Sequence, residues 1–132
     1  MSAMPAPAAS GSLAVALNGV TAVLVTAFAP ATDTVATGPM TRLAGRCAAA
    51  GVPVITVLGN TGEVFALEDD ERLTAVEAVV AGSGDAAVLV GLAGSLAAVQ
   101  RQMAQAAAAG AAAVMLHEPV DPLASSAGLT RP

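Results

Sequence analysis

The chain has 132 residues, which is room for one domain with a core, and it is rich in alanine, valine and glycine. A net charge of −5 and only two aromatic residues, Phe28 and Phe65, argue against a nucleic-acid partner, which requires clustered basic side chains and stacking surfaces. The single Cys47 excludes an internal disulfide, and all five basic residues are arginines, so the sequence contains no lysine.

The amino-terminal segment, residues 1–12, contains prolines and small residues and lacks the basic start of a secretory signal. We therefore expect a flexible tail here, followed by one domain at residues 13–132. The apolar stretch Leu13–Phe28 is interrupted by polar residues and is shorter than the roughly 20 residues that cross a bilayer, so it predicts a strand region. These features favour a cytoplasmic protein.

The first strand and helix follow this tail. Gly19–Phe28 is a nearly continuous apolar run, which is typical of a strand buried on both faces of a parallel sheet. Thr37 and Pro39 predict the start of a helix, and Gly51 predicts its end. The buried face of this helix is predicted at Met40, Leu43, Ala44 and Cys47.

Further strands and helices repeat at a spacing of about 30 residues. The remaining strands are predicted at Val52–Leu58, Ala87–Leu92 and Ala112–Leu116. The second helix begins at the acidic run Glu68–Glu71 and ends near Gly82, and the third begins after a Ser95 cap and ends at Gly110. Their buried faces are predicted at Leu73, Val76 and Val80, and at Leu96, Val99, Met103 and Ala107.

Strands that alternate with helices at this period predict an α/β fold with a parallel sheet and right-handed crossovers. Two architectures fit the pattern: a small doubly wound sheet, or part of a (β/α)8 barrel. A complete barrel has about 250 residues, so four strands and three helices amount to about half of one. Length alone favours the doubly wound sheet.

The turn Gly59-Asn60-Thr61-Gly62-Glu63 directly follows the second predicted strand. In βα folds ligands bind at the carboxyl ends of the strands. A hydroxyl, an amide side chain and backbone N–H groups suit a carboxylate or another oxyanion. Glycine, asparagine and threonine are also common in turns that bind nothing, so the spacing alone leaves both interpretations open.

Four other acidic or basic positions are considered as site residues. His117 follows the fourth strand, where it is either a general base or anion ligand, or a polar residue that ends a strand. For Glu63, we favour a carboxylate that accepts hydrogen bonds from nearby backbone N–H groups over a catalytic acid. His117, Glu118 and Asp121 do not complete a ligand set, so we predict no metal site.

Several motifs in the same order resemble one known family. Val57–Arg72 is similar to the signature of the dihydrodipicolinate synthase/N-acetylneuraminate lyase family, in which Gly-(Thr/Ser/Asn)-Thr-Gly-Glu precedes an acidic helix start. Gly19–Phe28 resembles the opening strand of the family, with Ala27 in place of its usual proline. Two further segments resemble the third strand and the passage into the fourth, namely Ala87–Ser95 and Ala108–Leu116. The resemblance extends from Gly19 to Leu129.

The resemblance implies that the chain is the first half of a (β/α)8 barrel, with four strands and three helices. It also implies that the turn residues Gly59, Asn60, Thr61 and Gly62 hold the carboxylate of pyruvate or a related 2-keto acid, with Thr61 as the binding hydroxyl. Asn60 stands where a hydroxyl often joins a proton relay, which an amide does not support. The family requires neither a metal nor another cofactor.

The Schiff-base lysine and the catalytic tyrosine of the family belong to its sixth and fifth strands, beyond Pro132. We therefore expect no catalytic residue in this chain. Val120 and Asp121 replace a tyrosine pair in the loop after the fourth strand, which favours the sugar-acid aldolases and dehydratases over dihydrodipicolinate synthase itself.

Two functions remain open at this point. The first is a truncated 2-keto-acid lyase, aldolase or dehydratase that is inactive alone. The second is a non-catalytic binding or assembly module, or half of a split enzyme. In either case we expect a homo-oligomer or a second half-barrel chain as partner, because half a barrel leaves its edge strands unpaired.

Overall fold

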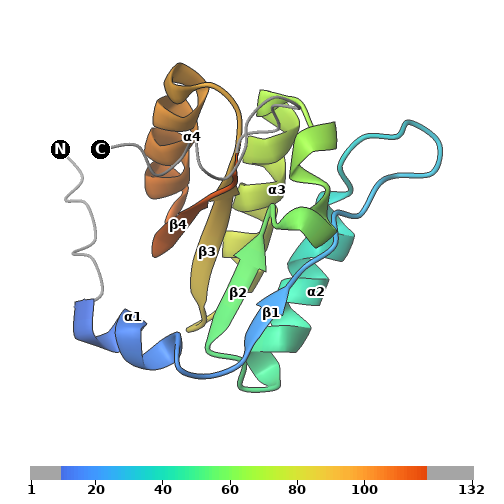
Figure 1. Cartoon of the computed structure of the whole chain (residues 1–132). Coiled ribbons are helices and arrows are strands. Elements are labelled where there is room, and N and C mark those ends of the chain that lie inside the picture. The colour runs from blue at the N-terminus through green and yellow to red at the C-terminus, as the bar shows by residue number, and fades with distance from the viewer. Residues whose placement is uncertain (1–9, 119–132) are drawn as a thin grey trace, which may run out of the picture.

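Figure 1 presents a computed structural model of the chain, which describes residues 10–118. Strands and helices alternate after one leading helix. In chain order the elements are α1 (Ser10–Ala16), β1 (Thr21–Val23), α2 (Thr37–Ala49), β2 (Val54–Val57), α3 (Asp69–Gly82), β3 (Ala87–Leu92), α4 (Leu96–Ala109) and β4 (Ala113–Leu116). Two short 3-10 helices, Asn60–Gly62 and Val64–Ala66, lie between β2 and α3.

The strand order decides between the two predicted architectures. All neighbouring strands are parallel, and their order is β1-β2-β3-β4, so each strand pairs with the one before it. The helices α2, α3 and α4 lie on the same side of this sheet (Figure 1). A doubly wound sheet reverses its strand order and carries helices on both faces. The fold is therefore the barrel-type arrangement, and the prediction of four strands joined by three helices is confirmed.

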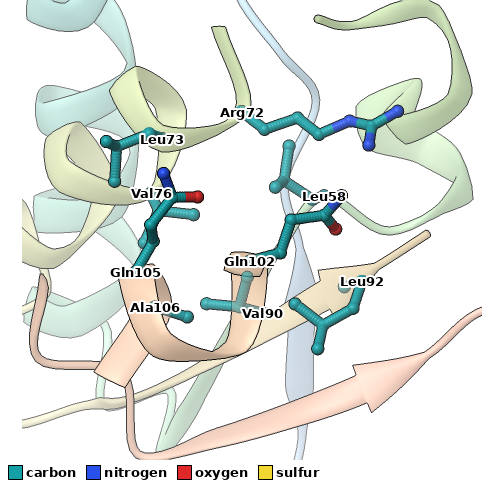
Figure 2. A pocket seen from close by; sticks show the side chains of 10 residues that line it. Leu58, Arg72, Leu73, Val76, Val90, Leu92, Gln102, Gln105 and Ala106 are labelled. Carbon is teal, nitrogen blue, oxygen red and sulfur yellow. The ribbon is translucent and has the colours of Figure 1, made fainter. Parts of the chain in front are cut away.

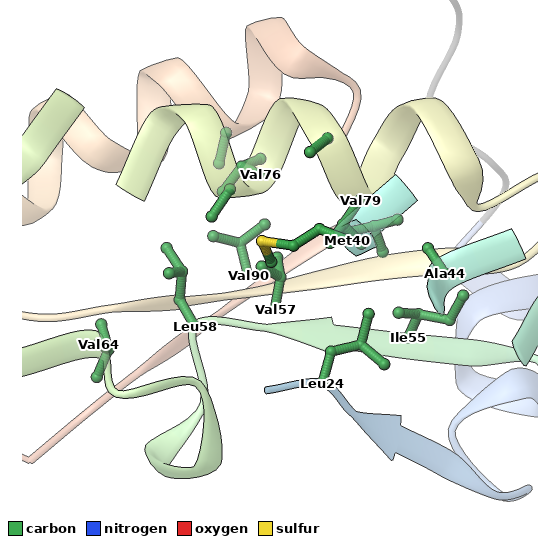
Figure 3. Close-up of a cluster of buried hydrophobic side chains, with 14 of the residues drawn as sticks. Leu24, Met40, Ala44, Ile55, Val57, Leu58, Val64, Val76, Val79 and Val90 are labelled. Carbon is green, nitrogen blue, oxygen red and sulfur yellow. The ribbon is translucent and has the colours of Figure 1, made fainter. Parts of the chain in front are cut away.

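The core lies between the sheet and its helices (Figure 3). All four residues of β2 are buried, and Ile55 and Val57 point from it toward Met40 of α2 and Val79 of α3. The opposite face of the sheet is open at both edges, because Val23 is 47% exposed and Met115 is 37% exposed. Small aliphatic side chains fill the core, as the composition predicted.

The helix α1 was not predicted from the sequence. It begins at Ser10, inside the segment expected to be a tail, and it includes the first residues of the stretch Leu13–Phe28 that was assigned to a strand region. That assignment is wrong at its amino-terminal end. Alanine and leucine favour helix when no sheet neighbour is available, which explains the difference. Neither α1 nor any other helix within residues 10–118 is long and apolar enough to cross a bilayer.

The first strand is shorter than predicted. Beyond Val23 the chain remains extended, and the N–H of Leu24 donates to the carbonyl of Thr56 at 2.9 Å. Phe28 then forms an isolated antiparallel bridge with Val35, so the apolar run turns away from the sheet and becomes part of a loop. The other three strands agree with their predicted ranges to within two residues at each end.

The buried face of α4 also differs from the prediction. Leu96 is 75% exposed and Met103 is 45% exposed, whereas Gln102 and Ala106 are buried. The amide of Gln102 accepts from the N–H of Ala93 at 3.1 Å and donates to the carbonyl of the same residue at 2.9 Å. This pairing with the end of β3 turns a polar side chain toward the core, which apolar periodicity did not predict.

Candidate functional site

The Gly59–Glu63 turn lies at the carboxyl end of β2, as predicted. Leu58, directly before it, has a left-handed backbone conformation with φ 60°, and Glu63 at its end has φ 56°. The turn is closed by a hydrogen bond of 3.0 Å from the N–H of Gly62 to the carbonyl of Gly59. A second bond of 3.0 Å joins the N–H of Glu63 to the carbonyl of Asn60.

Contacts with the chain after β1 hold this turn in place. A Cβ at Gly59 would lie 2.7 Å from Cγ1 of Val23, so a larger residue at this position would require the Val23 side chain to shift. The hydroxyl of Thr26 donates to the carbonyl of Gly62 at 2.6 Å. The role of Thr26 was missed from the sequence, because the two residues are 36 positions apart and no local pattern links them.

Asn60 and Thr61 carry the polar groups that the turn exposes. Both residues are exposed, while Gly59 and Gly62 are buried. Within residues 10–118, neither the Thr61 hydroxyl nor the backbone N–H groups of Asn60 and Thr61 form a hydrogen bond. The structure thus brings the four predicted binding residues together in one turn, with three donors available to an oxyanion.

His117 lies beside the same turn. Its backbone N–H donates to the carbonyl of Leu92 at 2.9 Å. This bond holds the backbone of His117, which directly follows β4, against the end of β3. Its ring nitrogen Nε2 lies 2.8 Å from the carbonyl oxygen of Leu58. Its ring also contacts the ring of Phe65 edge to face, with 5.6 Å between the ring centroids. His117 is therefore more than a polar residue that ends a strand, since its side chain contacts both flanks of the turn.

Glu63 does not have the predicted role. Its side chain is exposed, and within the described part of the chain its carboxylate accepts no hydrogen bond. The backbone of Glu63 stabilises the loop instead, because its carbonyl accepts from the N–H of Ala66 at 2.8 Å.

A polar cluster that sequence reasoning missed connects the loops after β2 and β3. The Nε of Arg72 donates to the carbonyl of Val64 at 3.0 Å, and another guanidinium nitrogen donates to the carbonyl of Ala93 at 3.3 Å. Asp69 lies 3.2 Å from the guanidinium of Arg101 and 3.5 Å from that of Arg72. The one available signal was Arg72 at the end of the family-like segment Val57–Arg72.

Two hollows in the structure do not coincide with the turn. The first, between α3 and α4, has a volume of about 10 Å³ and includes Leu73, Val76 and Gln105 among its lining residues (Figure 2). It has space for about one water molecule, which is too little for a substrate. The second, of about 490 Å³, lies at the amino ends of the strands near Pro53 and Asp85. Among residues 10–118, the side chains that line it include Asp85 and no arginine, so the described lining does not favour an anionic ligand.

The residues that could bind a metal do not gather in the described structure. Among residues 10–118, no three histidine, cysteine, aspartate or glutamate side chains lie close enough to hold a metal ion. Asp121, which the sequence placed near His117 and Glu118, lies outside the described residues. The predicted replacement of the tyrosine pair at Val120 and Asp121 falls there as well.

Comparison with known proteins assigns the family. A sequence model described as the dihydrodipicolinate synthetase family matches residues 16–130, nearly the whole chain. The chain belongs to this family. No curated protein matches it. Lyase or aldolase enzymes are thus its relatives, and the fold agrees with the amino-terminal part of their barrel.

Solved structures of the family agree with the fold. The dihydrodipicolinate synthase from Bacillus clausii is 30% identical with a TM-score of 0.82, over 89% of this chain and 40% of that chain. The enzyme from Rhodopseudomonas palustris is 28% identical with a TM-score of 0.71, over 76% and 34%. A prophage protein of the family from E. coli K12, solved in complex with pyruvate, is 24% identical with a TM-score of 0.74, over 84% and 38%. The chain thus spans 40% or less of the length of each of these structures.

Proposed function

We propose that the Gly59–Glu63 turn binds the carboxylate of pyruvate or a related 2-keto acid. The observation that carries this proposal is a set of three donors on the exposed residues of the turn that form no hydrogen bond within residues 10–118: the Thr61 hydroxyl and the backbone N–H groups of Asn60 and Thr61. Such donors suit an oxyanion, and the turn occupies the end of the strand where βα folds bind ligands. Family membership supports a 2-keto acid as the ligand class.

Binding and catalysis are separable in this chain. Asn60 stands at a position where the family often has a hydroxyl in a proton relay, and an amide neither gains nor loses a proton in that way. Schiff-base chemistry requires an amine, and the 132 residues contain no lysine. A guanidinium does not replace it, because it stays protonated. We propose that this polypeptide alone binds a 2-keto acid without lyase, aldolase or dehydratase activity.

We propose that the chain is nearer to the sugar-acid aldolases and dehydratases of the family than to dihydrodipicolinate synthase itself. The sequence observation in its favour is the replacement of a family tyrosine pair by Val120 and Asp121. A 2-keto sugar acid is therefore included beside pyruvate as a ligand to be tested.

A second candidate function is that of an assembly module or half of a split enzyme. It is favoured by the two edge strands β1 and β4, neither of which has a second neighbour within the described residues. The partner would be a second copy or a chain that supplies the remaining strands, together with the lysine. Activity that appears only on mixing with such a chain would distinguish this function from simple binding.

Titration with pyruvate, and separately with a 2-keto sugar acid, tests the binding proposal. Backbone amide chemical shifts should change mainly within residues 59–63, because the donors lie there. Thr61→Val keeps the side-chain shape and removes the hydroxyl, so we expect affinity to fall about five-fold, the equivalent of one lost hydrogen bond. Thr74→Val, which removes a hydroxyl from α3 that donates to the Asp70 carbonyl at 2.9 Å, is the matched control and should bind normally. Shifts centred on Gly94 and Ser95 instead would contradict the proposal.

A further inference from the structure

His117 and Leu58 meet across the central part of the sheet, although they are 59 positions apart. His117 follows β4 and Leu58 follows β2, so the contact crosses over β3. A carbonyl oxygen only accepts hydrogen bonds, so at 2.8 Å the ring must donate, and Nε2 must carry its proton. In the neutral ring, the contact therefore requires the tautomer that carries its proton on Nε2.

The residue between them leaves room for this contact. A Cβ at Gly91 would overlap the carbonyl oxygen of Leu58 and would lie 2.6 Å from Nε2 of His117. Gly91 is buried in β3, where a glycine weakens a strand unless another group must approach closely. The absence of a side chain at Gly91 is thus what allows the ring to reach the carbonyl.

The backbone of Leu58 needs such support. Its φ of 60° is in the left-handed region, which a leucine rarely adopts unless its surroundings hold it there. The side chain of Leu58 is buried, and its carbonyl is held by the His117 ring. On the far side of the turn, the same ring packs against Phe65. One side chain therefore contacts the residues that precede and follow the Gly59–Glu63 turn.

We propose that His117 is a positioning residue: it holds the left-handed conformation of Leu58 and thereby sets the conformation of the Gly59–Glu63 turn and its affinity for a carboxylate. The statement about affinity rests on the proposed function, whereas the statement about conformation does not. His117 acts on the ligand through the turn, so it is not assigned a catalytic role.

Two substitutions in the full chain test the conformational part without ligand. His117→Leu removes the donor, and we expect amide exchange at Gly62 and Glu63, whose N–H groups are hydrogen-bonded within the turn, to accelerate about five-fold, as for the loss of one hydrogen bond. His117→Gln places an amide nitrogen at a similar reach and should restore slow exchange. Slow exchange in His117→Leu would overturn the proposal, and so would fast exchange in both variants.

A measurement on the unmodified chain keeps the proposal testable if His117→Leu does not fold. Nitrogen-15 shifts of the His117 ring at neutral pH should identify a proton on Nε2. A proton on Nδ1 alone would overturn the proposal, because the ring would then have no donor for the Leu58 carbonyl.

Pyruvate titration of the same variants separates this inference from the proposed function. We expect the Kd of His117→Leu to rise about five-fold and that of His117→Gln to stay near the unmodified value. Equal affinity in all three chains would overturn the link between His117 and binding and leave the binding site intact. If pyruvate does not perturb the turn of the unmodified chain, the proposed function fails, and the exchange data alone decide the role of His117.

Discussion

Thr26 and Gly62 are joined by a hydrogen bond of 2.6 Å from a side-chain hydroxyl to a backbone carbonyl. Thr26 lies on the extended chain after β1, and Gly62 lies in the turn after β2. The candidate site is thus fixed from β1 on one side and from β4, through His117, on the other. Its geometry depends on strands that are not neighbours in the sheet.

We predict that Thr26→Val destabilises the fold by about 1 kcal/mol and loosens the turn, because the Gly62 carbonyl loses its donor. Denaturant unfolding measures the first effect, and exchange of the hydrogen-bonded amides of Gly62 and Glu63 measures the second. Thr41→Val is the matched control, because it removes a 2.9 Å bond to the carbonyl of Ala78, between α2 and α3. It should lose similar stability without faster exchange at the turn. Equal exchange profiles for the two variants would argue against a specific role for Thr26.

Gln102 should matter much more than its neighbour Gln105. Gln102→Leu leaves the buried N–H of Ala93 without its side-chain partner and leaves Arg72 as the remaining side-chain donor to the Ala93 carbonyl, which we expect to cost about 1–3 kcal/mol. Gln105 is exposed, and Gln105→Leu should change the free energy of unfolding by less than about 0.5 kcal/mol. Denaturant unfolding of both variants measures the difference. Similar stability for the two would mean that the pairing with Ala93 contributes little.

Treatment of the chain with borohydride and pyruvate should leave its mass unchanged. The reason is that Schiff-base formation within the sequence requires a lysine, and there is none. Intact mass spectrometry followed by peptide mapping is the measurement, with a lysine-containing enzyme of the family as the positive control. A stable reduced adduct at any internal residue would refute this prediction, whereas modification of the terminal amine would not.

The strands β2, β3 and β4 were predictable because each reads as a continuous apolar run in a parallel sheet, although three of the four residues of β4 are exposed. The turn at residues 59–63 was predictable because it directly follows such a run. The face of α4 was predicted wrongly, since periodicity assigns Met103 to the core and cannot recognise that Gln102 pairs with a backbone. The contacts of Thr26 with Gly62 and of His117 with Leu58 join positions that are 36 and 59 residues apart, so no local sequence pattern predicted them.

We expect the purified chain to associate in solution. Within the described residues β1 and β4 each lack a second neighbour, and apolar side chains such as Val25 and Met115 are exposed, at 50% and 37%. Unpaired strand edges and exposed apolar surface favour association. Sedimentation at micromolar concentration should therefore give a mass above 12.6 kDa. A sharp monomer with cooperative thermal unfolding would contradict this expectation.

The sequential strand order also determines when the candidate site can form during folding. Because each strand pairs with the one before it, the sheet can grow from the amino-terminal end as the chain emerges from the ribosome. The Thr26 bond to Gly62 becomes available once β1 and β2 have met. The His117 contact with Leu58 must wait for β4, so the turn acquires its second support only after β4 has paired with β3.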